Sequence, residues 1–272
     1  MARFAISPRE MLAGFWRNRA LIGLLTAREV AGRYQGSVLG LAWSLFHPLL
    51  MLVVYTFVFS VVFRARWGLA EESKTQFALV LFAGLMAYTL FAEVLNRAPS
   101  LIVSNVNYVK KVVFPLEVLP WVTLGSGLFH FIVSVAVWLI AYVLLVGMPP
   151  LTVLLLPVVL VPLVLGVMGL AWLLASLGVY LRDVAQVIGV LTTTLLFLTP
   201  IFYPLEILPD NFRFWISLNP LSAIVAWTRD VLIWGREPDW IAYGWFTLGS
   251  LAVAWLGFAW FQKTRKGFAD VL

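Results

Sequence analysis

The residue types that usually carry catalysis are sparse in this 272-residue sequence and do not form a recognisable catalytic or metal-binding pattern. The chain contains no cysteine, no G-x-x-x-x-G-K-[ST] phosphate-binding loop and no H-E-x-x-H metal motif. Its two histidines, His47 and His130, stand far apart in apolar stretches, which favours a hydrogen-bonded structural role over metal binding. We therefore expect neither enzymatic activity nor a cofactor bound by this chain.

Two acidic residues near apolar segments, Glu93 and Glu117, are candidates for a proton path across a membrane. Glu93 stands four residues before Arg97, and Glu117 follows the basic pair Lys110–Lys111, so ion pairing is the favoured explanation for both. The apolar segments otherwise lack the buried charges and internal repeats of an ion-coupled secondary carrier. They also lack the clustered acidic residues or histidines of an enzyme that acts on polyprenyl lipids.

The composition is that of an integral membrane protein. Hydrophobic residues make up 62% of the chain and charged residues only 12%, with a mean hydropathy of +0.96, whereas soluble domains are about a quarter charged. Several apolar segments reach the roughly 20 residues needed to cross the hydrocarbon core of a bilayer. The expected spans lie near residues 38–63, 77–97, 116–147, 151–178, 184–203 and 240–261. We expect an all-α integral membrane protein with six transmembrane helices.

The Lys and Arg residues outside these spans are unequally distributed. When six spans are threaded from the N-terminus, most of the basic residues fall on the side that holds both termini. The positive-inside rule then places both termini in the cytoplasm. The net charge of +6 is thereby explained by the cytoplasmic surface and anionic membrane lipids, without nucleic acid. No cleavable signal peptide is recognisable at the N-terminus.

The N-terminal region carries two capping-box patterns, S/T-x-x-E, at residues 7–10 and 26–29. The second predicts a short helix over about residues 27–35 that stops at Gly36. Its charged and apolar residues face different ways, as in a helix that lies in the membrane interface. The alternative is an ordinary positively charged flank that only sets the topology.

The segment 99–115 is too polar to span a membrane and too apolar to be a free loop. It could form a short cytoplasmic helix that offers Asn105, Tyr108, Lys110 and Lys111 to a partner. The alternative is an interfacial anchor, because Tyr and Lys are common at that depth. The residues alone leave the two interpretations equal.

The segment 204–236, between the last two spans, contains two helix starts. Asp210 can cap a helix over about residues 211–217, and Asn219 with Pro220 can start a second over about 221–233. The second helix reaches only about 20 Å, too short to cross. This pattern fits a re-entrant helical hairpin in the outer leaflet, and equally an aromatic loop lying on the membrane surface.

The spans offer aromatic and small polar side chains rather than charges. Trp43 and Phe46 share one face of the first span, and the fifth aligns Gly189, Thr193 and Phe197 at helical spacing. A neutral aromatic lining would let sugar rings slide past without tight binding. On the residues alone, ordinary helix packing through small residues is the favoured interpretation.

At this point a resemblance becomes specific. The segment REVAGRYQGSVLGLAWSLFHPLLMLVVYTFVFSVVF resembles the start of the permease subunits of polysaccharide-exporting ABC transporters, which export lipid-linked O-antigen, capsule or teichoic acid. The residues that match the family pattern are Arg33, Tyr34, Gly36, Ser37, Leu39, Gly40, Trp43 and Pro48. NVNYVKKVVFPLEVLP resembles the family's cytoplasmic coupling segment. YLRDVAQVIGVLTTTLLFLTPIFYP and NPLSAIVAWTRDVL resemble its fifth span and its outer re-entrant helices, so the resemblance covers nearly the whole chain.

This resemblance implies a homodimer of six-span subunits in the bacterial inner (cytoplasmic) membrane. Two copies of a separate ABC ATPase would bind Mg-ATP and drive transport. The substrate would be a polysaccharide carried on undecaprenyl pyrophosphate, which passes through a pore at the dimer interface. Residues 1–37 would be the N-terminal cytoplasmic segment, residues 38–262 the transmembrane domain and residues 263–272 a cytoplasmic tail.

The resemblance also implies roles for individual residues. The lipid-pyrophosphate entrance would comprise Arg28, Arg33 and Tyr34. The channel lining would comprise Trp43, Phe46, Tyr55, Phe59, Thr193, Phe197, Phe202 and Tyr203. The contact with the ATPase would comprise Asn105, Tyr108, Lys110 and Lys111. The alternative is a related ABC permease for a drug or a lipid, in which we would not expect the RYQGSVLG sequence.

Overall fold

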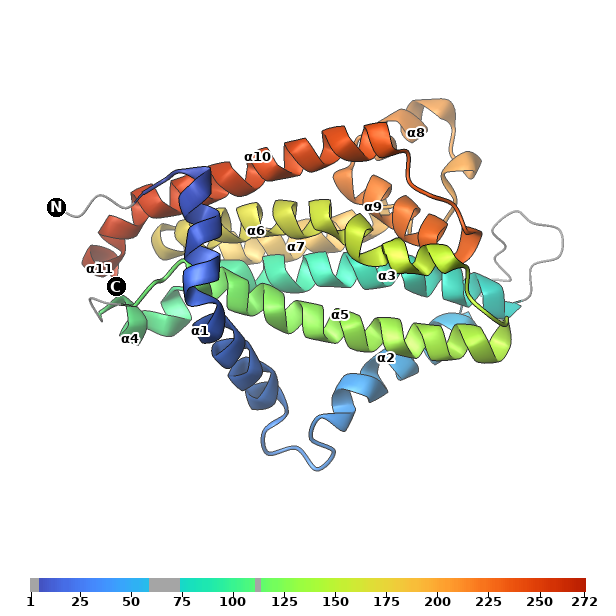
Figure 1. The fold of residues 1–272 in the computed structure, drawn as a ribbon, viewed down its shortest axis with the longest axis horizontal. Coiled ribbons are helices and arrows are strands. Elements are labelled where there is room, and N and C mark those ends of the chain that lie inside the picture. The colour runs from blue at the N-terminus through green and yellow to red at the C-terminus, as the bar shows by residue number, and fades with distance from the viewer. Residues whose placement is uncertain (1–4, 59–73, 111–113) are drawn as a thin grey trace.

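The computed structural model describes residues 5–58, 74–110 and 114–272, and every regular element in those ranges is helical (Figure 1). The helices are α1 (Pro8–Tyr34), α2 (Ala42–Tyr55), α3 (Lys74–Arg97), α4 (Val106–Val109), α5 (Val118–Leu145), α6 (Leu156–Tyr180), α7 (Val184–Leu198), α8 (Asp210–Ser217), α9 (Pro220–Arg229), α10 (Trp240–Thr264) and α11 (Phe268–Val271). Short 3₁₀ turns precede α4 and α6, and a π-helical turn, Asp230–Trp234, continues α9. The predicted all-α class is confirmed.

In the part of the chain that the structure describes, four helical stretches are long and apolar enough to cross a membrane, and they coincide with four of the predicted spans. They are Gln76–Ser100, Val118–Leu145, Leu151–Tyr180 and Trp240–Val271. The chain is thus a multi-pass membrane protein.

The other two predicted spans, 38–63 and 184–203, correspond to shorter apolar helices, Ala42–Val58 and Val184–Leu198. The first predicted span continues past Val58 outside the described residues. The fifth is shorter than predicted because Pro200 disfavours helical backbone at the residue before it. Within the described residues, length and composition therefore identify four spans, and the predicted count of six is not confirmed.

The central helix of the fold is α3, which is surrounded by α2, α5, α6, α7 and α9. In Figure 1 it runs through the middle of the bundle. The indole nitrogen of Trp138 on α5 donates to the carbonyl oxygen of Leu79 at 3.0 Å, and the hydroxyl of Tyr88 donates to the carbonyl oxygen of Thr192 on α7. In apolar surroundings such bonds have no competing water, so they fix α3 against its neighbours.

The helices α6 and α10 pack with their backbones nearly in contact. A Cβ atom placed on Gly257 would lie 1.9 Å from the carbonyl oxygen of Gly169. Glycine at both positions permits this approach, which is the usual way that small residues bring membrane helices together.

The N-terminal helix is longer than the predicted helix over residues 27–35. Ser7 caps α1 as expected, because its Oγ accepts a hydrogen bond from the backbone N–H of Glu10 at 3.2 Å. The second capping-box pattern does not start a helix, because Thr26 lies inside a continuous α1. The predicted helix over 27–35 is therefore only the last part of a 27-residue helix. The prediction of its end was accurate, since α1 stops at Tyr34 and Gly36 adopts a φ of 82°.

Packing explains why α1 continues through its second capping pattern. Ile22 is buried against Val118 and Val122 of α5, with Phe15 and Leu25 packed beside them. A capping-box pattern starts a new helix only where the residues before it are not themselves helical. Here the preceding turns are held on α5, so the tertiary contacts override the local signal.

The hairpin region combines one buried and one exposed helix. Asn219 caps α9 as predicted, with its side chain accepting from the backbone N–H of Leu221 at 3.0 Å. Asp210 does not cap α8; it is the first helical residue, and Pro209 occupies the cap position without a side-chain bond. The helix α9 packs on α3 and α6, whereas α8 leaves Trp215 and its other large aromatic side chains exposed.

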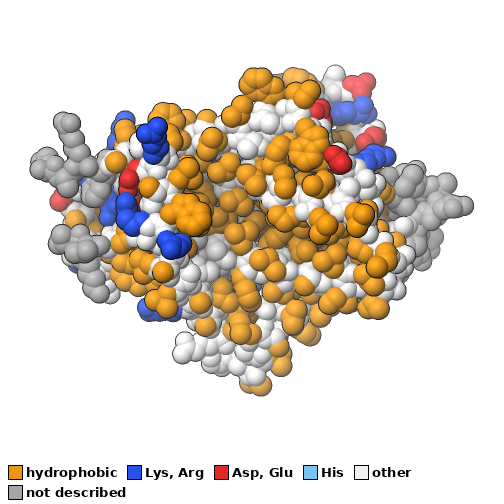
Figure 2. Space-filling view, in the orientation of Figure 1, with side chains coloured by type: hydrophobic (Ala, Val, Ile, Leu, Met, Phe, Trp, Pro, Cys, Tyr) orange, Lys and Arg blue, Asp and Glu red, His pale blue; other side chains and the backbone are white. Residues whose placement is uncertain are grey.

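Both termini and α4 lie at one end of the bundle, while α8 lies toward the other (Figure 1). On the face shown in Figure 2, charged side chains gather at the two ends and the surface between them is largely hydrophobic. This distribution is that of a bundle whose middle is embedded in lipid.

Candidate functional site

A polar cluster joins the end of α1 to α3 and α5. The guanidinium of Arg33 lies 2.7 Å from the carboxylate of Glu93, and Nδ1 of His130 lies 3.3 Å from the same oxygen. The hydroxyl of Tyr34 is 2.9 Å from Nε2 of His130. The structure thus places two of the predicted entrance residues, Arg33 and Tyr34, in one hydrogen-bonded group. His130 is a hydrogen-bonded residue, as expected from the sequence.

A second pair of contacts extends this cluster. Arg97 of α3 forms an ion pair with Glu29 of α1 and lies 3.9 Å from Glu93, which confirms the local pairing predicted from the spacing. The end of α1 is therefore attached to α3 through Arg33–Glu93 and through Glu29–Arg97. We call Glu29, Arg33, Tyr34, Glu93, Arg97 and His130 the α1–α3 cluster.

The α1–α3 cluster is partly accessible from outside the bundle. The side chain of Arg33 is 36% exposed, so a polyanion could approach it and replace Glu93 as its partner. Burial raises the pKa of the Tyr34 phenol, so its hydroxyl stays protonated near neutral pH and remains able to donate a hydrogen bond. Bidentate recognition of phosphate oxygens is a characteristic use of arginine.

The third predicted entrance residue, Arg28, lies beside the predicted coupling segment. A cavity of about 170 Å³ is lined by the polar residues Arg28, Glu29, Asn105 and Tyr108, together with apolar residues. The ring of Tyr108 stacks on Phe114, with centroids 4.2 Å apart and planes within 8°. Residues predicted for the entrance and for coupling therefore meet at one place. Lys110 is exposed, and Lys111 lies outside the described residues.

The coupling segment is also attached to the C-terminal end of α10. Arg265 lies 2.5 Å from Glu117 and donates to the carbonyl oxygen of Phe114 at 2.9 Å. Glu117 is thus ion-paired, as expected, but its partner in the part of the chain that the structure describes is Arg265 rather than the nearby Lys110. The actual partner is distant in sequence and is brought in by the packing of α10 against the bundle.

The predicted channel residues of α2 are partly exposed. The rings of Trp43 and Phe46 meet edge to face with centroids 5.2 Å apart, and their side chains are 41% and 46% exposed. Tyr55 is partly buried against the core. Phe59 lies outside the described residues.

The predicted channel residues of α7 and its end form a second partly exposed group. Phe197 is 62% exposed and its ring lies 5.8 Å from that of Phe202. The hydroxyl of Tyr203 donates to the carbonyl oxygen of Phe197 at 2.9 Å. The hydroxyl of Thr193 bonds back to Gly189 at 2.9 Å. Since α2 and α7 both pack on α3, each presents an outer aromatic face that a single chain leaves uncovered.

A buried charged residue that sequence reasoning did not single out is Arg229. It is 5% exposed, and its guanidinium donates to the carbonyl oxygens of Val80 at 3.0 Å, Pro200 at 2.6 Å and Ile201 at 2.7 Å. The overlooked signal was an arginine inside an apolar helical stretch, a position that usually has a specific role.

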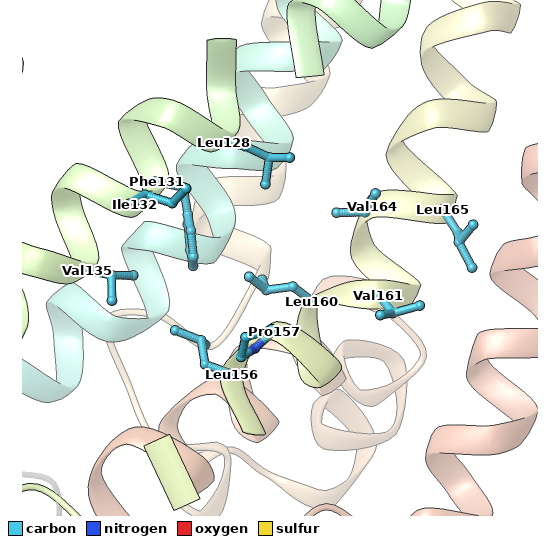
Figure 3. A pocket seen from close by; sticks show the side chains of 10 residues that line it. All are labelled: Leu128, Phe131, Ile132, Val135, Leu156, Pro157, Leu160, Val161, Val164 and Leu165. Atoms are coloured by element: carbon cyan, nitrogen blue, oxygen red, sulfur yellow. The ribbon is translucent and has the colours of Figure 1, made fainter. Parts of the chain in front are cut away.

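One hollow of the surface has an entirely apolar lining. A groove of about 450 Å³ lies between α5 and α6 and is lined by residues such as Phe131, Ile132, Leu160 and Val164 (Figure 3). Its lining offers no side-chain hydrogen-bond partner to a sugar or a pyrophosphate. Within the described residues, no group of three or more His, Asp or Glu side chains could hold a metal ion.

Comparison with known proteins identifies the family. The sequence model of the ABC-2 type transporter family matches residues 20–233. The O-antigen export system permease protein RfbA of Klebsiella pneumoniae is 27% identical over 255 residues, covering 93% of this chain and 95% of the relative. The permease of the same name from Myxococcus xanthus is 28% identical over 257 residues, covering 94% and 96%. The resemblance noted in the opening segment is confirmed, and the chain belongs to the ABC-2 type transporter family.

Proposed function

We propose that this chain is the transmembrane subunit of an ATP-driven exporter that moves an undecaprenyl-pyrophosphate-linked polysaccharide, such as O-antigen, across the bacterial inner membrane. The observation that carries the proposal is the near full-length similarity to O-antigen export permeases. The sequence pattern RYQGSVLG supports it over a drug- or lipid-exporting permease of the same architecture.

In this proposal two copies of the chain form the transporter and two copies of a separate ATPase hydrolyse Mg-ATP. Each subunit has six spans, with α2 and α7 as the first and fifth and the segment 204–236 as a re-entrant hairpin. The burial of α9 against α3 and α6 supports the hairpin interpretation over a surface loop. The uncovered aromatic faces of α2 and α7 support a pore between the two subunits. Both termini lie in the cytoplasm, with residues 1–37, 38–262 and 263–272 as N-terminal segment, transmembrane domain and tail.

The lipid pyrophosphate enters beside α1. Arg28 and Arg33 attract its charge, and Tyr34 contacts the first part of the substrate. The argument rests on the exposure of Arg33 and on its exchangeable partner Glu93. Sugars then pass Trp43, Phe46, Tyr55, Thr193, Phe197, Phe202 and Tyr203, with Phe59 as a further lining residue.

The ATPase contacts Asn105, Tyr108, Lys110 and Lys111 and moves the spans mechanically. The cavity shared by Arg28 and Tyr108 would let such a push at α4 reach the entrance directly. Replacing Tyr108 and Lys110 by Ala should uncouple ATP hydrolysis from export. Unchanged coupling in that variant would show that the contact lies elsewhere.

The deciding experiment is to deplete this chain in its own host and locate the lipid-linked glycan. We expect completed polymer to accumulate on the cytoplasmic side of the inner membrane. A normal surface glycan without accumulation would instead favour a drug or lipid as substrate. Joint replacement of Arg28 and Arg33 by Gln should reproduce the accumulation, with Arg19→Gln, an exposed arginine earlier on α1, as the matched control.

A further inference from the structure

A polar cavity of about 250 Å³ lies between the end of α7 and the end of α9. One wall consists of residues 200 and 203–206, and the other comes from α9 and its π-helical turn. The chemically distinctive side chains of the lining are Tyr203, Glu206, Arg229, Asp230, Trp234 and Arg236. Of these residues only Tyr203 has a role in the proposed function, as a channel-lining residue.

Hydrogen bonds join the two walls of this cavity. Arg229 forms part of its lining and donates to the carbonyl oxygens of Pro200 and Ile201 on the opposite wall. Because Arg229 is itself held by the carbonyl of Val80 on α3, the two walls are fixed relative to each other. A site whose walls are fixed before binding loses less conformational entropy when it is occupied.

The lining combines two carboxylates, two guanidinium groups and two aromatic rings. Within the described residues, the carboxylates of Glu206 and Asp230 and the guanidinium of Arg236 form no ion pair or hydrogen bond of their own. Asp230 is half-buried, with Arg236 and Arg229 as its electrostatic neighbours. The opposing charges balance, so the cavity has no strong preference for an anion or a cation. Instead it offers hydrogen-bond donors and acceptors at several points.

We propose that this cavity is a binding subsite for one sugar residue of the exported polymer, on the outer side of the membrane. The inference rests on the proposed function, which supplies a saccharide as the substrate class. Trp234 or Tyr203 provides an aromatic face for the apolar side of the ring, and Asp230, Glu206 and Arg236 bond its hydroxyls. The volume lies below the roughly 300–1,000 Å³ of typical ligand pockets, which suits a single ring rather than a chain segment.

The test uses the full-length chain in lipid nanodiscs and oligosaccharides obtained by hydrolysing the host's own surface polysaccharide, with the lipid removed. Saturation-transfer difference NMR measures their binding to the wild type and to Trp234→Ala, Asp230→Asn and Arg236→Gln. Matched controls are Trp215→Ala and Asp210→Asn on the exposed helix α8. Arg236 is exposed, so its variant should fold even if Trp234→Ala does not.

We expect each cavity variant to weaken binding by about two- to tenfold, the range for losing one aromatic or polar contact, while the α8 variants bind like the wild type. The proposal would be overturned if Arg236→Gln and Asp230→Asn bound the oligosaccharides as tightly as the wild type. It would also be overturned if the α8 controls lost as much affinity as the cavity variants. If depletion of the chain blocks glycan export yet the variants bind normally, only the subsite fails. If depletion leaves export intact, the proposed function fails instead.

Discussion

Two regions along α3 hold charged side chains in contrasting ways. Near the start of α3, Arg229 is buried and its guanidinium is bonded to three backbone carbonyl oxygens. Near the end of α3, Glu93 is shared among the side chains of Arg33, Arg97 and His130. The first region is an arginine held by backbone, and the second is a carboxylate held by side chains.

This difference determines how easily the contacts of each charged group can change. Carbonyl oxygens move only with the backbone, so the contacts of Arg229 cannot change without moving α3 or the end of α7. The partners of Glu93 can rotate away, and Arg33 and Arg97 are 36% and 32% exposed. The contacts at the hairpin end therefore depend on the position of the backbone, whereas those at the α1 end depend on side-chain conformation.

The largest effect on stability should come from removing the buried guanidinium of Arg229. Arg229→Met removes the donor of three buried, charge-assisted hydrogen bonds to carbonyl oxygens, so the free energy of unfolding should fall by about 3 kcal/mol or more. The thermal denaturation midpoint in nanodiscs measures this loss. Arg229→Lys should lose less, because an ammonium keeps the charge but not the planar fork. The matched control is Arg213→Met on α8, whose side chain is 44% exposed. A midpoint for Arg229→Met equal to that of the control would remove the contrast between the two regions.

A smaller effect is expected at the carboxylate. Glu93→Gln leaves Arg33 and His130 without an ionised partner, at a cost of about 1–3 kcal/mol. If Arg33 is the main partner, Arg33→Gln in the same background should cost less than it does alone. A double-mutant cycle on thermal stability measures that coupling. Strictly additive losses would show that the Arg33–Glu93 contact contributes nothing.

The phenol of Tyr34 should have a weaker effect again. Tyr34→Phe removes one hydrogen bond to His130 and keeps the ring, so the expected loss is about 0.5–1.5 kcal/mol. The ¹⁵N chemical shifts of the His130 ring provide a second measurement, because they report loss of the bond at Nε2. Unchanged shifts would mean that this bond does not form in the membrane.

The smallest effect is expected at an ion pair outside both regions. Arg17 and Glu10 on α1 are 2.6 Å apart, with side chains 59% and 31% exposed. Arg17→Gln should cost less than about 1 kcal/mol, and added salt should abolish the difference from the wild type. If Arg17→Gln lowered the free energy of unfolding as much as Glu93→Gln does, the partly buried ion pairs of α3 would contribute no more than this exposed one.

Predictions based on neighbours in sequence were largely accurate. The cap at Ser7, the end of α1 near Gly36, the cap at Asn219 and the Glu93–Arg97 pair were all found. The capping predictions at Thr26 and Asp210 were wrong. At Thr26 the packing of α1 outweighs the local capping signal, and at Asp210 the preceding proline occupies the cap position.

The helical class, the apolar segments and several helix ends follow from the amino-acid sequence, because these depend on hydrophobic periodicity and on contacts three or four residues apart. Which charges meet depends instead on how the helices pack in space. Arg33 and His130 are separated by 97 residues, and Arg229 and Val80 by 149. Such contacts depend on how close-packed helices are arranged around α3, and no local pattern carries that information.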